Sequence, residues 1–106
     1  MSDVVLLLST FPNINDARSA AHSLVDERLV ACGNIAPGVE SIYRWKGEIE
    51  NSMEVLVIFK TTADRADEAQ ARLRKMHPYE VPEIIRVPVA AGWPEYLGWV
   101  RECVTK

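Results

Sequence analysis

The sequence predicts an α+β fold of the ferredoxin-like βαββαβ type, with two helices on one face of an antiparallel sheet and an added C-terminal helix. Strand and helix patterns follow one another in this order along the 106 residues, which is the split βαβ arrangement. Hydrophobic residues make up 48% of the chain and charged residues 25%, as in a globular core. The length suits a single domain over residues 1–106.

The first strand and the first helix have clear patterns. Val4 to Leu8 form a continuous aliphatic run, which is typical of a central strand buried on both faces. A helix is expected over residues 13–28, because Asn13 can cap its first turn with Asp16 three residues later. Its apolar residues recur at helical spacing, and they are Ala17, Ala21, Leu24 and Val25.

A long hairpin is expected next. Residues 31–45 have the composition of a strand, and Pro37 with Gly38 indicates a bulge or bend part way along it. Lys46 and Gly47 predict the hairpin turn, and the return strand is expected over residues 53–61. Its apolar run is too long for a sheet exposed on either face, so something must cover this hairpin.

A second helix is expected after the hairpin. Thr62 or Asp64 can cap its start, and its apolar stripe continues to Met76. The helix should end at His77, because Pro78 disfavours the α conformation in the residue before it.

The last part of the chain should add an edge strand and a short helix. Pro82 introduces a strand over residues 83–89, in which Pro88 cannot donate a ladder hydrogen bond. Pro94 suits the first turn of a helix that ends near Cys103. The two main helices would leave one sheet face bare, so we expect subunits to associate and cover it. Three aromatic side chains also need cover, namely Trp45, Trp93 and Trp99.

Several classes of function are disfavoured. The formal net charge is −3 and basic residues are dispersed, so no nucleic-acid partner is expected. The sequence shows no basic leader and no apolar stretch long enough to span a bilayer, which predicts a cytoplasmic protein without a membrane partner. Cys32 and Cys103 lack the spacing of a zinc site. No catalytic motif is present, so we do not expect an enzyme.

Five segments together closely resemble the CutA family of divalent-cation tolerance proteins. They are LVACGNI at 29–35, YRWKG at 43–47, KTT at 60–62, HPYEVPEI at 77–84 and YLGW at 96–99. The resemblance covers nearly the whole chain. It implies a ferredoxin-like homotrimer, similar in architecture to the PII signal proteins, that acts in tolerance of copper and other divalent cations. It brings no established reaction.

His77 and Cys32 are the candidate metal ligands, because imidazole and thiolate are good donors to copper and zinc. Copper or another divalent cation is therefore the expected cofactor, although not an obligatory one. Copper-binding members of the CutA family resemble this chain but carry a cysteine and a second histidine where Ser9 and Met76 stand here. The alternatives are that His77 only ends the helix and that Cys32 belongs to the core.

A second candidate site is a cleft between subunits with apolar walls and a few polar groups. Lys60 follows an apolar strand and needs an anionic partner, for which Glu83 is a candidate. The cleft would bind a small anionic ligand, as in a sensor of the PII type, or would be a polar network that holds the trimer together. A trimeric scaffold for another protein is a further alternative. The expected cleft residues are Tyr43, Trp45, Lys60, Tyr79, Glu83 and Trp99.

Overall fold

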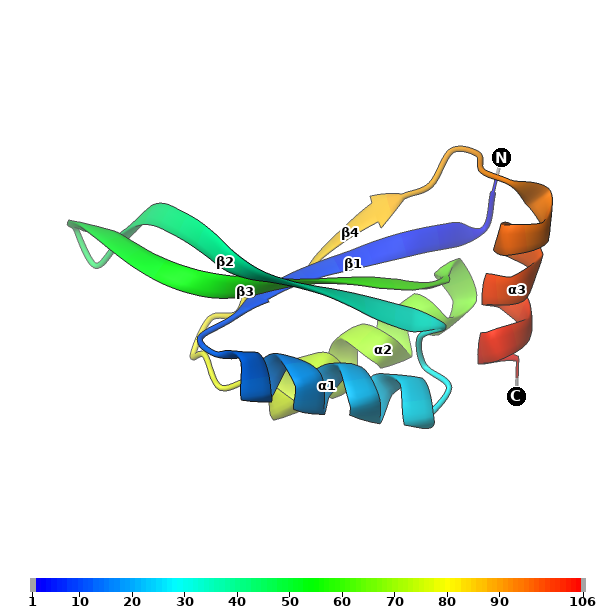
Figure 1. Ribbon diagram of the computed structural model, residues 1–106, viewed down its shortest axis with the longest axis horizontal. Coiled ribbons are helices and arrows are strands. Elements are labelled where there is room, and N and C mark those ends of the chain that lie inside the picture. The colour runs from blue at the N-terminus through cyan, green and yellow to red at the C-terminus, as the bar shows by residue number, and fades with distance from the viewer. Residues whose placement is uncertain (1, 106) are drawn as a thin grey trace.

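The computed structural model describes residues 2–105 and has a four-stranded sheet with two helices packed on one face (Figure 1). The elements are β1 (Val4–Phe11), α1 (Ile14–Asp26), β2 (Cys32–Trp45), β3 (Glu48–Thr62), α2 (Ala63–Met76), β4 (Ile85–Pro88) and α3 (Pro94–Val104). The order β2-β3-β1-β4 and the antiparallel pairing of all neighbouring strands confirm the predicted fold class.

The first strand lies inside the sheet, as its continuous apolar run predicted. β1 pairs with β3 from Val4 opposite Thr62 to Phe11 opposite Val55, and with β4 on its other side. It is longer than the predicted run because pairing with β3 continues to Phe11. β4 is confirmed as an edge strand, but it covers only Ile85–Pro88 instead of residues 83–89 and ends at the proline that cannot donate a ladder hydrogen bond.

Helices α1 and α2 bury their apolar stripes against one sheet face to form the main core. The predicted cap of α1 is confirmed, because the side chain of Asn13 accepts a 2.8 Å hydrogen bond from the backbone N–H of Asp16. Val25, which shares the helical spacing of the apolar residues, lies outside the core and is 43% exposed on α1. Thr62 occupies the N-cap of α2 but makes no capping bond to the backbone, and its hydroxyl donates to the Asp64 carboxylate. The helix ends before His77 as predicted.

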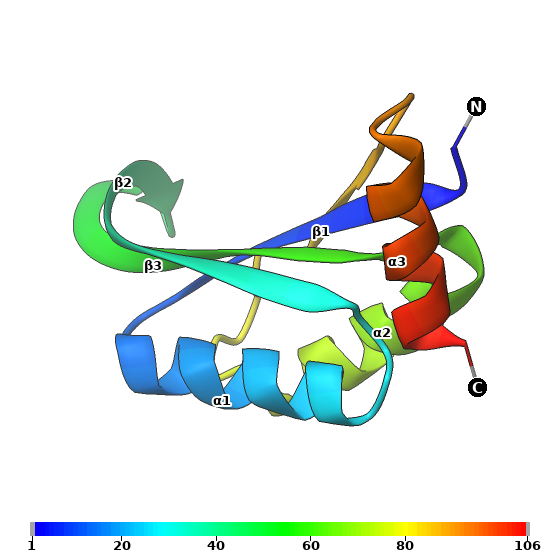
Figure 2. The same cartoon turned by 45° about the vertical axis from the view of Figure 1, so that its right-hand side comes forward.

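The β2–β3 hairpin extends well beyond the rest of the sheet and gives the molecule its 44 Å long axis (Figures 1 and 2). The predicted bulge is present, because the register of β2 against β3 shifts between Ala36 and Val39. The predicted turn is also present, with positive φ angles at Lys46 and Gly47 that match a type I′ hairpin. β3 begins at Glu48 rather than near residue 53, because its polar first half pairs with β2 along the whole hairpin.

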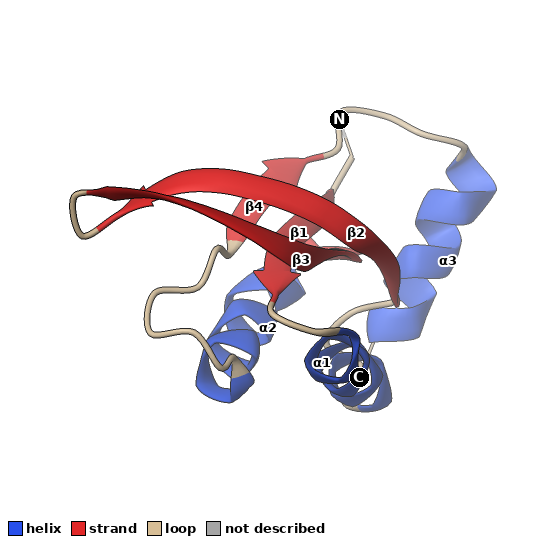
Figure 3. Ribbon diagram, turned by 60° about the vertical axis from the view of Figure 1, so that its left-hand side comes forward, coloured by secondary structure: helices blue, strands red, loops and turns tan. Residues whose placement is uncertain are grey.

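One sheet face has no helix layer over most of its area (Figure 3). We call it the outer face, and alternation along the paired strands assigns to it Leu6, Leu8, Leu56, Ile58, Ile85 and Val87. α3 packs only at one end of the sheet, where Val100 and Val104 join Val4 and Ala31 in a second cluster. The predicted need for cover therefore stands, and Ile85 is 49% exposed within the subunit.

Candidate functional site

His77 lies at the junction between α2 and the C-terminal end of β1, and the residue is only 7% exposed. The ring stacks on Phe11 with a centroid separation of 4.4 Å. Nε2 lies 2.9 Å from the carbonyl oxygen of Thr10, and Nδ1 lies 3.1 Å from the backbone nitrogen of Tyr79. His77 thus ties the segment that follows α2 to the end of β1.

The partners of His77 fix its tautomer. A carbonyl oxygen only accepts hydrogen bonds, so Nε2 carries the proton and donates to Thr10. Nδ1 accepts from the N–H of Tyr79, which commits the remaining ring lone pair. A metal ion at either nitrogen would have to displace one of these bonds. This geometry matches the alternative in which His77 ends the helix, and it does not favour metal binding within one subunit.

The stability of the protein should depend on the protonation of His77. Burial holds the pKa of this imidazole below its ordinary value, although the hydrogen bond to Thr10 acts in the opposite direction. The unfolded chain therefore binds the proton more readily, so the free energy of unfolding should fall as the pH drops through about 6.5. Urea unfolding from pH 8 to 5 would measure this fall, which should shrink in His77→Gln. An unchanged profile in that variant, with exposed His22→Gln as the control, would contradict the assignment.

The family resemblance implies further copper ligands at positions 9 and 76, and both side chains pack within the subunit. Ser9 is fully buried on the helix side of β1, and its hydroxyl has no hydrogen-bond partner among residues 2–105. Met76 is half-buried and packs against the main core. Both residues therefore contribute to packing.

The unsatisfied hydroxyl of Ser9 gives a stability prediction. Ser9→Ala should leave the free energy of unfolding unchanged or raise it by up to about 1 kcal/mol, because it removes a polar group buried without a partner. Thr61→Val is the matched control: the Thr61 hydroxyl is also fully buried but donates a 2.7 Å bond to Leu29, and its loss should cost about 1 to 2 kcal/mol. Urea denaturation measures both. A loss in Ser9→Ala as large as in the control would show that this hydroxyl has a partner.

Cys32 and Lys60 face each other across β2 and β3 on the outer face. The ammonium of Lys60 donates to Oδ1 of Asn34, and the thiol of Cys32 lies 3.8 Å from the same oxygen. The Lys60 Nζ also lies 5.8 Å from the centre of the Tyr96 ring on α3. Cys32 is half-buried, so it is neither a closed core residue nor a fully exposed thiol.

The two predicted metal ligands do not meet within one subunit. Cys32 pairs with Lys60, whereas Thr10, which binds His77, pairs with Leu56, so the two sites lie about 13 Å apart along β3. Across residues 2–105, no group of three or more His, Cys, Asp or Glu side chains is arranged to hold a metal ion.

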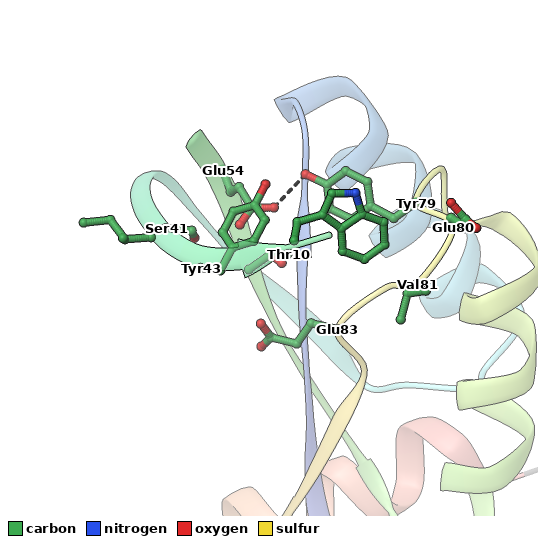
Figure 4. A pocket seen from close by; sticks show the side chains of 10 residues that line it. Thr10, Ser41, Tyr43, Glu54, Tyr79, Glu80, Val81 and Glu83 are labelled. Carbon is green, nitrogen blue, oxygen red and sulfur yellow. Dashed lines mark hydrogen bonds between the residues drawn. The ribbon is translucent and has the colours of Figure 1, made fainter. Parts of the chain in front are cut away.

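A pocket of about 590 Å³ opens where the hairpin leaves the sheet. Figure 4 shows Glu54 of β3 and the residues after α2 converging on it, with the Tyr79 hydroxyl directed at the Glu54 carboxylate. This hydrogen bond is 2.6 Å long, and Glu54 is only 8% exposed. Tyr43 and Trp45 of β2 provide aromatic walls, so the pocket joins segments that are far apart in the sequence.

The pocket is acidic. Glu54, Glu80 and Glu83 line it, and none of the described lining residues is lysine, arginine or histidine. Partial burial, and then the nearby Glu54 carboxylate, raise the pKa of Glu83. Burial and the hydrogen bond to Glu54 likewise raise the pKa of Tyr79, so its hydroxyl remains a donor. The pocket therefore presents negative charge without a balancing cation inside the subunit.

The residues expected to form a cleft fall into two groups within one subunit. Tyr43, Trp45, Tyr79 and Glu83 line the pocket. Lys60 and Trp99 lie at the α3 end, where Trp99 packs near Tyr96 and Lys60 bonds Asn34 instead of Glu83. A cleft shared between subunits stays a prediction.

Sequence reasoning missed the central residue of the pocket. Glu54 stands at the start of the apolar run of β3, and a carboxylate at the edge of such a run was the available signal.

Known proteins of similar sequence and structure indicate the family of this chain. The family model for the CutA1 divalent ion tolerance protein matches residues 5–103. The chain belongs to the CutA1 family. The divalent-cation tolerance protein CutA of Thermus thermophilus is 48% identical over 102 residues, which are 96% of this chain and 97% of that protein. The crystal structure of CutA from Xylella fastidiosa superposes with a TM-score of 0.96 at 43% identity and covers 98% of this chain and 100% of that one.

Other CutA1 relatives are longer proteins. The CutA homolog of Xenopus laevis is 42% identical over 95 residues, which are 90% of this chain but 63% of that protein. The shared part is therefore the domain described above. The helices described over residues 2–105 include none that is long and apolar enough to cross a membrane.

Proposed function

We propose that this CutA1 family member acts in tolerance to divalent cations in the cytoplasm, as a homotrimer of the PII type. The family match carries the first part of the proposal, because relatives that align over nearly their full length are named for divalent-cation tolerance. The trimer follows the resemblance to CutA proteins and agrees with the bare outer face. Sheets would face one another inside the trimer, and α1 and α2 would remain outside.

The outer face supports self-association on energetic grounds. Ile85 and Val87 of the edge strand are exposed beside half-buried Leu6 and Leu8. Burying an aliphatic side chain is worth about 1.5 to 3 kcal/mol, so covering several of them stabilises an assembly substantially. The exposed Trp45 and Trp99 would gain cover in the same way.

For metal contact, we propose copper at Cys32 and not at His77. The thiol of Cys32 is half-buried and soft, which suits Cu(I). Both ring nitrogens of His77 are already bonded. We propose that a bound cation is not obligatory for folding, because packed apolar side chains form the main core.

The metal proposal is tested by titrating the reduced protein with Cu(I), Cu(II) and Zn(II) against a competing chelator. Wild type should bind Cu(I) at least about tenfold more tightly than Cys32→Ser, a loss of about 1.4 kcal/mol. His77→Gln should bind like wild type. Equal Cu(I) binding by wild type and Cys32→Ser would remove Cys32 from the proposal, and a loss confined to His77→Gln would reverse it.

Tolerance itself is tested by growth. Cells that lack their own gene of this family, and that express either wild type or Cys32→Ser, would be grown in rising copper, zinc and cadmium. Wild type should extend growth to higher metal concentration. Identical growth with wild type and with an empty vector would contradict a role in tolerance.

A small anionic ligand and a protein partner are the alternatives. The aromatic pocket favours a ligand site, but its carboxylates disfavour an anion within one subunit. Thermal shift with a panel of dicarboxylates and nucleotides, for wild type and Lys60→Ala, measures this alternative. A stabilisation that disappears in Lys60→Ala would favour the anionic ligand over the metal.

A further inference from the structure

We propose that Lys60 of one subunit inserts into the acidic pocket of the next subunit, where its ammonium meets the carboxylates of Glu54 and Glu83. This inference rests on the proposed self-association and names the residues that connect neighbouring copies. It concerns two features at opposite ends of the outer face: a pocket that lacks a cation and a lysine that lacks an anion.

The carboxylates of the pocket need a cationic partner if another subunit covers the pocket and excludes water. Glu54 is only 8% exposed within the single subunit. Among residues 2–105, only Tyr79 forms a hydrogen bond with its carboxylate, at Oε2. The second oxygen, Oε1, remains free for another donor. Glu83 adds a carboxylate whose pKa is raised by partial burial and by Glu54. Covering this pocket with apolar surface would cost several kcal/mol per uncompensated charge.

Lys60, in turn, lacks an anionic partner among the described residues. It lies half-buried on the outer face among Leu6, Ile58 and Cys32. Within residues 2–105, the partners of its ammonium are the neutral oxygen of Asn34 and the Tyr96 ring. Any subunit that covers this face also covers Lys60. A buried ammonium without a carboxylate is strongly destabilising. Lys60 therefore needs an anionic partner from the covering copy.

The two features cannot meet within a subunit. Lys60 and Glu54 lie six residues apart in the same extended strand, which separates their Cα atoms by about 20 Å. A cation at one end of a face and an acidic pocket at the other suit a head-to-tail interface, in which different patches of two copies meet. A closed ring of three copies, the assembly that the resemblance to CutA proteins implies, satisfies every Lys60 and every pocket.

Other basic side chains near the hairpin fit the pocket less well. Arg44 donates to the carbonyl oxygen of Gly47 in its own turn, and Lys46 is exposed at that turn, whereas Lys60 is half-buried. Arg86 of β4 forms an ion pair with Asp67. Lys60 is the cation that lies on the outer face without a carboxylate partner among the described residues.

The test is a charge-reversal cycle on the full chain. Glu83→Lys and Lys60→Glu would each place like charges at the contact, and the double variant would restore opposite charges with reversed polarity. Dilution followed by mass photometry or light scattering gives the concentration at which half of the protein dissociates. Each single variant should raise it at least about 30-fold, and the double variant should recover at least about tenfold. Asp26→Lys, at an exposed residue that ends α1 on the helix side of the sheet, is the control and should match wild type.

A second measurement does not depend on variants that fold. Carbodiimide joins a lysine directly to a carboxylate in contact with it. A mixture of ¹⁴N and ¹⁵N wild-type protein should give cross-linked peptides between Lys60 and Glu54 or Glu83 that contain both labels.

The outcomes separate this inference from the proposed function. A wild-type protein that is monomeric would overturn self-association itself. A wild-type trimer whose double variant is no better than the weaker single variant, and that gives no mixed-label cross-link at Lys60, would overturn the Lys60 contact alone. Recovery in the double variant together with the mixed-label cross-link is the result that we expect.

Discussion

Ile85→Asp is expected to convert the protein from a trimer to a monomer at micromolar concentration. Ile85 is 49% exposed on β4, so within one subunit the change costs little. In the assembly it would bury a carboxylate on an apolar face and remove about 2 kcal/mol of burial at each interface. Size-exclusion chromatography with light scattering measures the change. A fall in melting temperature should accompany it, because association stabilises the folded state.

The control for Ile85→Asp is Val25→Asp. Val25 is a β-branched side chain of similar exposure, 43%, but it lies on the outside of α1. Its replacement should leave the mass unchanged and shift the stability by less than about 1 kcal/mol. If both variants dissociate equally, or if neither does, the outer face is not the surface that associates.

His77→Ala is expected to lower the free energy of unfolding by about 2 to 4 kcal/mol while leaving metal binding unchanged. The change removes the ring that stacks on Phe11 and strands the carbonyl of Thr10 and the N–H of Tyr79. His77→Gln should lose less, because its amide can still donate to Thr10. Urea denaturation gives the stabilities, and chelator competition gives the affinities for copper and zinc.

The result for His77 distinguishes a structural role from a ligand role. A metal ligand would show a large loss of affinity with a modest loss of stability, and its stability would depend on added metal. Such an outcome would contradict the geometry described here, in which the imidazole closes the junction between α2 and β1.

Much of the fold could be predicted because it depends on local patterns. Asn13 with Asp16, the proline after His77 and the Lys46-Gly47 pair each fix a helix end or a turn through their own backbone chemistry. The ends of the strands were harder to predict from the sequence. The first part of β3 is polar, and only pairing with β2 reveals that it starts at Glu48. Val25 shares the helical spacing of the buried residues of α1 but is exposed, because helical spacing alone does not define the width of a buried stripe.

The candidate site was harder to predict because it depends on register. His77 was recognised as a residue of interest, but its partners are backbone groups of Thr10 and Tyr79, which no side-chain pattern shows. Lys60 was matched with Glu83 from the strand order, yet within one subunit Lys60 lies six positions along β3 from Glu54 in the pocket that Glu83 lines. Glu54 was missed because its importance comes from Tyr79, 25 positions away.

The most direct measurement is native mass spectrometry of the wild-type protein purified without chelator. We expect a species of three copies of the 11.9 kDa chain, about 36 kDa, that persists on dilution to low micromolar concentration. The same spectrum would show any retained copper as an added mass. A single species of 11.9 kDa at these concentrations would contradict trimer formation, because the outer face and its Lys60 would then have no partner.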